Sequence, residues 1–89
     1  MAVVRLRAPL KDRADGRSEV DVPGDSIGAV LRGLERVYPR LQGWVLDEHG
    51  RIRRHVNVFV DGEKGQEETP VGPQARIHVL PSISGGSAS

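Results

Sequence analysis

The side chains that could carry acid–base or metal chemistry are scattered along the chain. The histidines show no i, i+4 pair and no other metal-ligand spacing; they are His49, His55 and His78. Two pairs of adjacent carboxylates, Asp47-Glu48 and Glu67-Glu68, stand in loop-like sequence, where adjacency alone does not make an acid–base pair. There is no cysteine, which excludes disulfides, a thiol nucleophile and a thiolate metal site. These patterns predict a protein that is not an enzyme and holds no metal.

The basic residues offer a different kind of chemistry, the recognition of acidic partners. Arg51, Arg53 and Arg54 form a cluster that suits either a solvated turn or a weak contact with such a partner. Over the whole chain, 13 Lys and Arg residues are balanced by 12 Asp and Glu residues, so we expect no general attraction to nucleic acid or to an anionic membrane. With a single Phe, Tyr and Trp, and with no GxGxxG or P-loop motif, the sequence predicts neither a nucleic-acid partner nor a stably bound cofactor.

The length and the first residues indicate a single cytoplasmic domain. A chain of 89 residues is the usual size of one domain. Its beginning, MAVVRLRAPL, carries Arg5 inside a short apolar run, which is unlike a signal peptide. No apolar run is long enough to cross a bilayer. The lack of cysteine agrees with a reducing compartment.

A pair of adjacent glycines, Gly85 and Gly86, stands in the segment PSISGGSAS. Glycine pairs are common in turns because glycine reaches positive φ at little steric cost. Only three residues follow this pair, so no further element stands beyond it for a turn to reach. Taken alone, the segment fits a frayed end. Its significance depends on the elements that come before it.

The first elements are predicted to be a β-hairpin. Residues 3–6 are mainly apolar, and residues 18–22 alternate between polar and apolar side chains, as half-buried strands do. Residues 11–17 between them are polar and contain Asp15-Gly16, a strong turn signal. We therefore expect two antiparallel strands joined by a polar loop.

A helix is the most strongly indicated element. Apolar residues recur at helical spacing, at Ile27, Val30, Leu31, Leu34 and Val37. The opposite side is polar and carries Arg32, Glu35 and Arg36. Asp25 or Ser26 is placed to cap the first turn, and Pro39 is expected to end the helix near Tyr38.

The second half of the chain is predicted to add the remaining strands. Residues 55–60 alternate, and Asp61-Gly62 after them is typical of a hairpin turn. Residues 63–75 read as a loop with room for a short edge strand, and residues 76–80 read as a last strand that ends at Pro81. Phe59 and Leu80 fall on the strand faces opposite the core valines.

One core between the helix and the sheet follows from these assignments. Its predicted members are Ile27, Val30, Leu31, Leu34, Val56, Val58, Val60, Ile77 and Val79. In the less regular residues 41–54, Trp44, Val45 and Leu46 are expected to pack against this core, and His49-Gly50 indicates a turn.

In this order of elements, three stretches resemble the MoaD/ThiS family of ubiquitin-like sulfur carrier proteins. VPGDSIGAVLRGLERVYP (22–39) is similar to the family's capped helix. HVNVFVDGE (55–63) is similar to the central strand and turn, above all in the cysteine-biosynthesis branch of carriers. IHVLPSISGG (77–86) is similar to the last strand, the proline and the Gly-Gly tail, and this ending is the most specific of the three.

The resemblance implies an α+β protein with a β-grasp fold, in which a mixed sheet of four or five strands lies over one main helix. The domain would span residues 1–81, and residues 82–89 would be a flexible C-terminal tail. The family's mechanism implies that a partner enzyme uses ATP to adenylate the carboxylate of Gly86, beside Gly85. A sulfur donor then converts the adenylate to a thiocarboxylate, and the carrier passes that sulfur to a biosynthetic enzyme.

The resemblance also implies a partner-binding surface. Leu80, just before the proline, would belong to the surface that meets the activating enzyme, with Phe59 on the same face of the sheet. Pro81 and Ile83 would set the direction in which the tail leaves and give the partner a point to grip. A competing interpretation is that residues 41–54 cover Phe59 and Leu80.

The chain departs from the family pattern after Gly86, where typical carriers end. Ser87, Ala88 and Ser89 follow, so the carbonyl of Gly86 is in a peptide bond. The chain is then a precursor that a protease, expected to be a metalloprotease, trims after Gly86; or the extra residues are an artefact; or the domain is an inert β-grasp interaction module. A ubiquitin-like modifier, joined to lysines through Gly86, would share the same adenylation. The sequence leaves these alternatives open, together with the receiving pathway: cysteine, molybdopterin, thiamin or a natural product.

Overall fold

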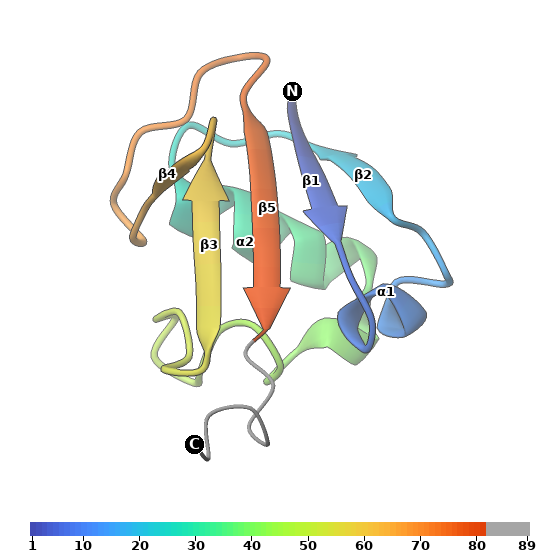
Figure 1. The fold of residues 1–89 in the computed structure, drawn as a ribbon. Helices are drawn as coiled ribbons and strands as arrows, with labels where there is room; N and C mark the ends of the chain where they lie inside the picture. The colour runs from blue at the N-terminus through green and yellow to red at the C-terminus, as the bar shows by residue number, and fades with distance from the viewer. Residues whose placement is uncertain (82–89) are drawn as a thin grey trace.

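The computed structural model describes residues 1–81, in which one mixed sheet carries a helix on one of its faces (Figure 1). In chain order the elements are β1 (Ala2–Leu6), α1 (Leu10–Arg13), β2 (Glu19–Val22), α2 (Ile27–Val37), the 3-10 helix η1 (Pro39–Leu41), β3 (Val56–Val60), β4 (Glu63–Lys64) and β5 (Arg76–Pro81). The strands lie in the order β2-β1-β5-β3-β4. Strands β1 and β5 are parallel, and the other neighbours are antiparallel. The predicted mixed sheet over one main helix is confirmed.

Helix α2 begins at a side-chain cap and buries one face. Ser26, and not Asp25, is the cap residue; its hydroxyl accepts a hydrogen bond from the backbone N–H of Ala29 at 3.2 Å. The predicted apolar face is buried at Ile27, Val30, Leu31 and Leu34. Val37 was predicted on that face, but 59% of it is exposed. Val37 is the last residue of the helix, so the buried face of α2 ends at Leu34.

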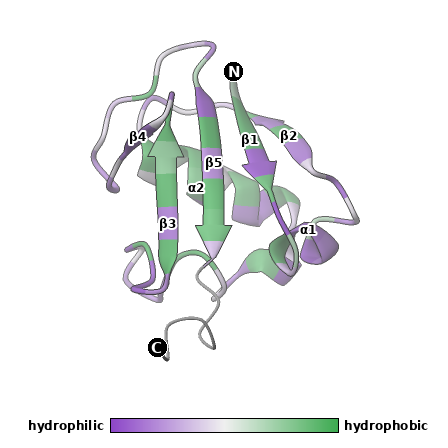
Figure 2. Ribbon diagram, viewed as in Figure 1, coloured by the Kyte–Doolittle hydropathy of each residue, from purple (hydrophilic) through white to green (hydrophobic). Residues whose placement is uncertain are grey.

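The central strands follow the predicted alternation. Buried and more exposed residues alternate along β1 and most of β5, and hydrophilic residues interrupt the hydrophobic ones along β5 in Figure 2. The predicted core residues of the strands are buried at Val56, Val58, Ile77 and Val79. Val60 is only partly buried, because it lies at the end of β3 where the chain turns away. Asp61 and Gly62 both have positive φ, as the predicted two-residue hairpin turn requires.

Two segments that looked polar or irregular in the sequence also contribute to the core. Residues 11–17, predicted as a polar loop, include most of the short helix α1; Leu10, the first residue of this helix, and Ala14, just after it, are fully buried. In residues 41–54, Val45 and Leu46 are buried as expected. Trp44 is not in the core: 39% of it is exposed, and the Arg13 guanidinium lies 3.7 Å from its ring centroid. The indole of Trp44 therefore lies at the protein surface, where it makes a cation–π contact with Arg13.

The predicted helix surface also needs one correction. Arg32 and Arg36 are exposed, but Glu35 is half-buried and one of its carboxylate oxygens is buried without a hydrogen-bond partner in the described part of the chain. The backbone N–H of Leu46 donates a hydrogen bond to this carboxylate, while burial raises the pKa of Glu35 above its usual value. Glu35 thus faces the 41–54 segment and not open water. Within residues 1–81, no helix is long and apolar enough to cross a membrane.

Candidate functional site

The face of the sheet opposite α2 is the candidate docking surface, here called the open face. Side chains alternate across a strand, so residues beside the core positions must point to this face. Its members are Val3 and Arg5 of β1, Asn57 and Phe59 of β3, and Arg76, His78 and Leu80 of β5. Helix α2 lies behind the sheet in Figure 1, and no described helix or strand crosses in front of β5 and β3.

Phe59 and Leu80, two of the four residues predicted from the sequence to meet a partner, lie on this open face. The register of β3 and β5 pairs Phe59 with His78 and Asn57 with Leu80. Phe59 and Leu80 are therefore diagonal neighbours, close enough for large side chains to contact one partner surface. Both are partly exposed. Residues 41–54 run along one end of the sheet in Figure 1, where Val45 and Leu46 enter the core, and do not cross the open face.

The described residues end at the last residue of strand β5. Pro81 is the last residue of β5, pairs with Val56 and is partly exposed. Leu80 comes directly before it, so the apolar part of the open face adjoins the exit of the chain. The other predicted site residues, Ile83, Gly85 and Gly86, lie outside the described residues.

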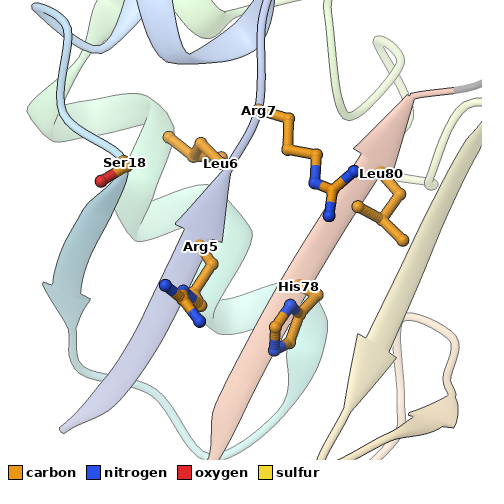
Figure 3. A pocket seen from close by; sticks show the side chains of 6 residues that line it. All are labelled: Arg5, Leu6, Arg7, Ser18, His78 and Leu80. Carbon is orange, nitrogen blue, oxygen red and sulfur yellow. The ribbon is translucent and has the colours of Figure 1, made fainter.

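A small hollow with basic walls lies beside Leu80 (Figure 3). Its volume is about 180 Å³, and it is lined by Arg5, Leu6, Arg7, Ser18, His78 and Leu80. Arg5 forms an ion pair with Glu19 of the neighbouring strand, with Nε and Oε2 3.1 Å apart. Arg5 and Arg7 were not predicted from the sequence to be site residues. Val3, Arg5 and Arg7 are spaced two residues apart, which puts their side chains on one face of a strand. This spacing could have identified the two arginines as neighbours on the sheet.

The arginine cluster singled out in the sequence lines a wider depression near the start of β3. That depression has a volume of about 570 Å³ and is lined by Asp47 and residues 51–55. Asp47 organises its rim: one carboxylate oxygen accepts hydrogen bonds from the backbone N–H groups of His49 and Arg51, at 2.8 and 3.0 Å. These bonds, the one from Arg51 foremost, lower the pKa of Asp47. The Glu67 carboxylate accepts a hydrogen bond from the backbone N–H of Ile52 at 2.6 Å, which is a second contact that holds residues 51–55 in place.

The histidines do not come together in the fold. His78 lies opposite Phe59 on β5, and His55 precedes β3. His49 lies 3.7 Å from Glu48 on the exposed turn. In the part of the chain that the structure describes, no group of three His, Cys, Asp or Glu side chains is arranged to hold a metal ion. The described residues are therefore suited to binding a partner. The surface for this is the open face, which is apolar and basic beside Pro81.

The sequence of this chain is similar to those of known proteins. A model of the ThiS family matches residues 4–86. Sulfur carrier protein CysO of Mycobacterium tuberculosis is 29% identical over 89 residues, which cover 93% of this chain and 96% of that protein. Small archaeal modifier protein 1 of Haloferax volcanii is 34% identical over 86 residues, which cover 92% of this chain and 97% of that protein.

Solved structures show the same fold. The crystal structure of CysO from Mycobacterium tuberculosis matches with a TM-score of 0.84 at 26% identity, covering 93% of this chain and all (100%) of that one. The crystal structure of SAMP1 from Haloferax volcanii matches with a TM-score of 0.81 at 30% identity, covering 96% of this chain and 98% of that one. The similarity therefore extends over the whole sheet and helix, and is not confined to one motif.

Proposed function

The chain belongs to the ThiS family of small ubiquitin-like sulfur carriers, and from that premise we propose that it carries sulfur as a thiocarboxylate on Gly86. It is a carrier and not an enzyme, so the catalysis belongs to its partners. The observation that best supports the proposal is the family match, which runs through residue 86 and so includes both glycines. The open face beside the exit of the chain is the surface that such partners would need.

The proposed chemistry uses the main-chain carboxylate of Gly86. That carboxylate attacks the α-phosphate of ATP in the active site of an adenylating enzyme and releases pyrophosphate. Sulfur delivered by the donor as hydrosulfide (HS⁻) then attacks the carbonyl carbon of the acyl-adenylate. The C–O bond to AMP breaks, AMP leaves, and loss of the proton on sulfur gives a thiocarboxylate, which is passed to a sulfur-accepting biosynthetic enzyme. ATP is consumed by the activating partner, and we propose no cofactor bound to the carrier itself. Because the activating partner uses ATP, we propose that the protein acts in the cytoplasm.

The proposed chemistry accounts for the length and composition of the segment after Pro81. Gly86 is the fifth residue after Pro81, so its carboxylate can lie at most about 18 Å from the end of β5. Reactive acyl-adenylates must be shielded from water, so they form in enclosed sites. Glycines without side chains let the main chain enter such a site closely. We propose that the domain docks outside the site through Phe59, Leu80, Pro81 and Ile83 and inserts the glycines.

The residues after Gly86 require a processing step in this proposal. Ser87 follows Gly86, which puts the reactive carbonyl in a peptide bond. We propose that a protease, of the metalloprotease class, cleaves after Gly86 and removes Ser87, Ala88 and Ser89. Three residues at about 3.3–3.6 Å each would displace the terminal carboxylate by some 10 Å, too far for near-attack geometry.

The test compares two chain lengths. Protein ending at Gly86 and protein ending at Ser89 are each incubated with ATP, a sulfur donor and the adenylating enzyme of the source cell. Only the Gly86 form should gain about 16 Da by mass spectrometry, since one oxygen is replaced by sulfur at a carboxylate pre-positioned for attack. Thiocarboxylation of the Ser89 form without loss of residues would refute the processing step. No activation of the Gly86 form by any cognate enzyme would refute the carrier function and favour an inert module.

Conjugation to other proteins is the second candidate function. It is favoured by the 34% identity with small archaeal modifier protein 1. The same adenylate of Gly86 would be attacked by a lysine amine of a target, forming an isopeptide bond. A ladder of conjugates in cell extract that requires Gly86 would identify a modifier. A free thiocarboxylate without conjugates would identify a carrier. The similarity to CysO favours the carrier branch, with cysteine, molybdopterin, thiamin or a natural product as the pathway it supplies.

A further inference from the structure

We propose that the hollow between Arg5, Arg7 and His78 receives a carboxylate side chain of the activating enzyme, with Arg7 as the residue that selects it. This inference rests on the proposed function, because it names how the carrier is recognised by its partner. It concerns a charged contact beside the apolar pair Phe59 and Leu80. The experiment below separates its failure from failure of the carrier function.

The topology of the sheet brings the three basic groups together. Arg5 and His78 are register partners in the parallel pairing of β1 with β5, so both point to the open face. Arg7 lies two residues beyond Arg5, just after the end of β1. Figure 3 shows its guanidinium extending over β5 between His78 and Leu80. The hollow of about 180 Å³ among these groups is large enough for one carboxylate group.

Arg7 is the cation that remains available in this hollow. Arg5 is already paired with Glu19 at 3.1 Å, and Glu19 is the acidic neighbour of that strand position. In residues 1–81 no carboxylate lies within ion-pair distance of Arg7, whose side chain is exposed. A guanidinium has parallel N–H donors that match the two oxygens of a carboxylate. Arg7 is therefore the better placed of the two arginines to accept a partner's acidic group.

The remaining walls of the hollow favour an acidic side chain of a protein. Leu6, at 3% exposure, is buried and adds little surface, but Leu80 is half-buried and leaves apolar surface beside the guanidinium. Apolar walls suit the methylene stem of Glu or Asp and exclude water when a partner docks. Exclusion of water strengthens the ion pair. A free phosphate would satisfy the cations but leave these walls uncovered.

The position of the hollow links recognition to the chemistry. Leu80 is both a wall of the hollow and the residue before Pro81, where the chain leaves the sheet. An acidic side chain held by Arg7 would therefore fix the partner against the exit of the tail. A carrier without this contact would dock more weakly, while its Gly86 would react normally once bound.

The first test measures activation of the chain ending at Gly86. Arg7→Glu should raise KM about tenfold or more with little change in kcat, because like charges would meet across the contact. Arg7→Lys should give a smaller increase, since it keeps the charge but loses the two-pronged donor. Arg32→Glu is the matched control; Arg32 is exposed on α2, away from the open face, and its KM should stay within about twofold of the original. Equal effects of Arg7→Glu and Arg32→Glu would overturn the proposal.

The second test does not depend on activation. Amide NMR shifts of the full chain are followed during titration with an acetylated polyglutamate peptide, with a neutral polyglutamine peptide and with inorganic phosphate. Shifts at Arg5, Arg7, His78 and Leu80 with polyglutamate alone, lost in Arg7→Glu, are expected. Equal shifts with phosphate would indicate a small-anion site, and shifts centred on residues 51–55 would move the contact to the arginine cluster; either result overturns the proposal. If the Gly86 form is never activated, the carrier function fails and this titration alone decides the hollow.

Discussion

Leu80 lies diagonally across from Phe59 on the open face, because β3 and β5 pair Leu80 with Asn57 and His78 with Phe59. Leu80 is also followed directly by Pro81, the last residue of β5. A large apolar pair therefore adjoins the last residue of β5. Partly exposed apolar side chains of this kind are typical of the centre of a protein–protein interface.

Replacing Leu80 with Glu should weaken binding to the activating enzyme and leave the fold intact. The new charge would have to be buried in the interface, while in the free protein it can reach water because Leu80 is partly exposed. Binding is measured by titration calorimetry and folding by thermal unfolding. Val37→Glu makes the same change at the exposed end of α2 and should bind normally. Normal binding by the Leu80 variant would remove this face from the docking surface.

Truncation of Leu34 to Ala should cost about 2–5 kcal/mol of the free energy of unfolding. Leu34 is fully buried between α2 and the sheet, so truncation leaves a cavity in a small core. Val37→Ala is the control, because 59% of Val37 is exposed and little packing is lost. Urea unfolding followed by circular dichroism gives both values. A similar cost for the two variants would contradict the assigned orientation of α2.

Glu35 should make the protein less stable as the pH rises. Burial raises the pKa of this carboxyl from its ordinary value of 4.5, so the folded protein holds the proton more tightly than the unfolded chain. The free energy of unfolding therefore falls as the pH rises from about that ordinary value through the folded pKa. Glu35→Gln cannot ionise and lacks this component. Its melting temperature relative to the original protein should increase with pH over that range.

The matched control for Glu35 is Glu68→Gln. Glu68 is exposed in the loop before Thr69, so this variant makes the same carboxyl-to-amide change without removing a buried carboxyl. The lowered pKa of Asp47 acts in the opposite direction, with stability lost as the pH falls, but it is common to all three proteins and cancels in the differences. A constant difference between Glu35→Gln and the original protein at every pH would contradict the assigned burial.

The end of the tail should be read to a single residue by the activating enzyme. A chain that ends at Gly85 places its carboxylate about 3.3–3.6 Å short of the position that Gly86 would occupy. Such an error is large for a reaction that depends on near-attack geometry, so activation should fall by at least about 100-fold. The measurement is ATP–pyrophosphate exchange with forms ending at Gly85 and Gly86. Equal exchange rates would show that docking does not fix the position of the carboxylate.

Local patterns in the sequence were enough to predict the individual elements. Ser26 and Pro39 bound helix α2 because capping and helix termination depend on the chemistry of neighbouring residues. The Asp61-Gly62 turn follows from two adjacent residues that accept positive φ. Phe59 and Leu80 could be assigned to the outer face because alternation along a strand is a local property. The Gly85-Gly86 motif and the similarity of the chain to a carrier family could also be recognised from the sequence.

The tertiary structure decided which elements meet, and with that the composition of the site. Arg5 and His78 are far apart in the chain, and only the parallel pairing of β1 with β5 places them side by side. Trp44 looked like a core residue, yet its neighbours Val45 and Leu46 are buried and Trp44 lies against Arg13 at the surface. Hydrophobic burial is non-directional, so composition shows how much apolar surface must be covered and not which side chain covers it. Strand register and close packing make that choice, and they depend on the whole chain at once.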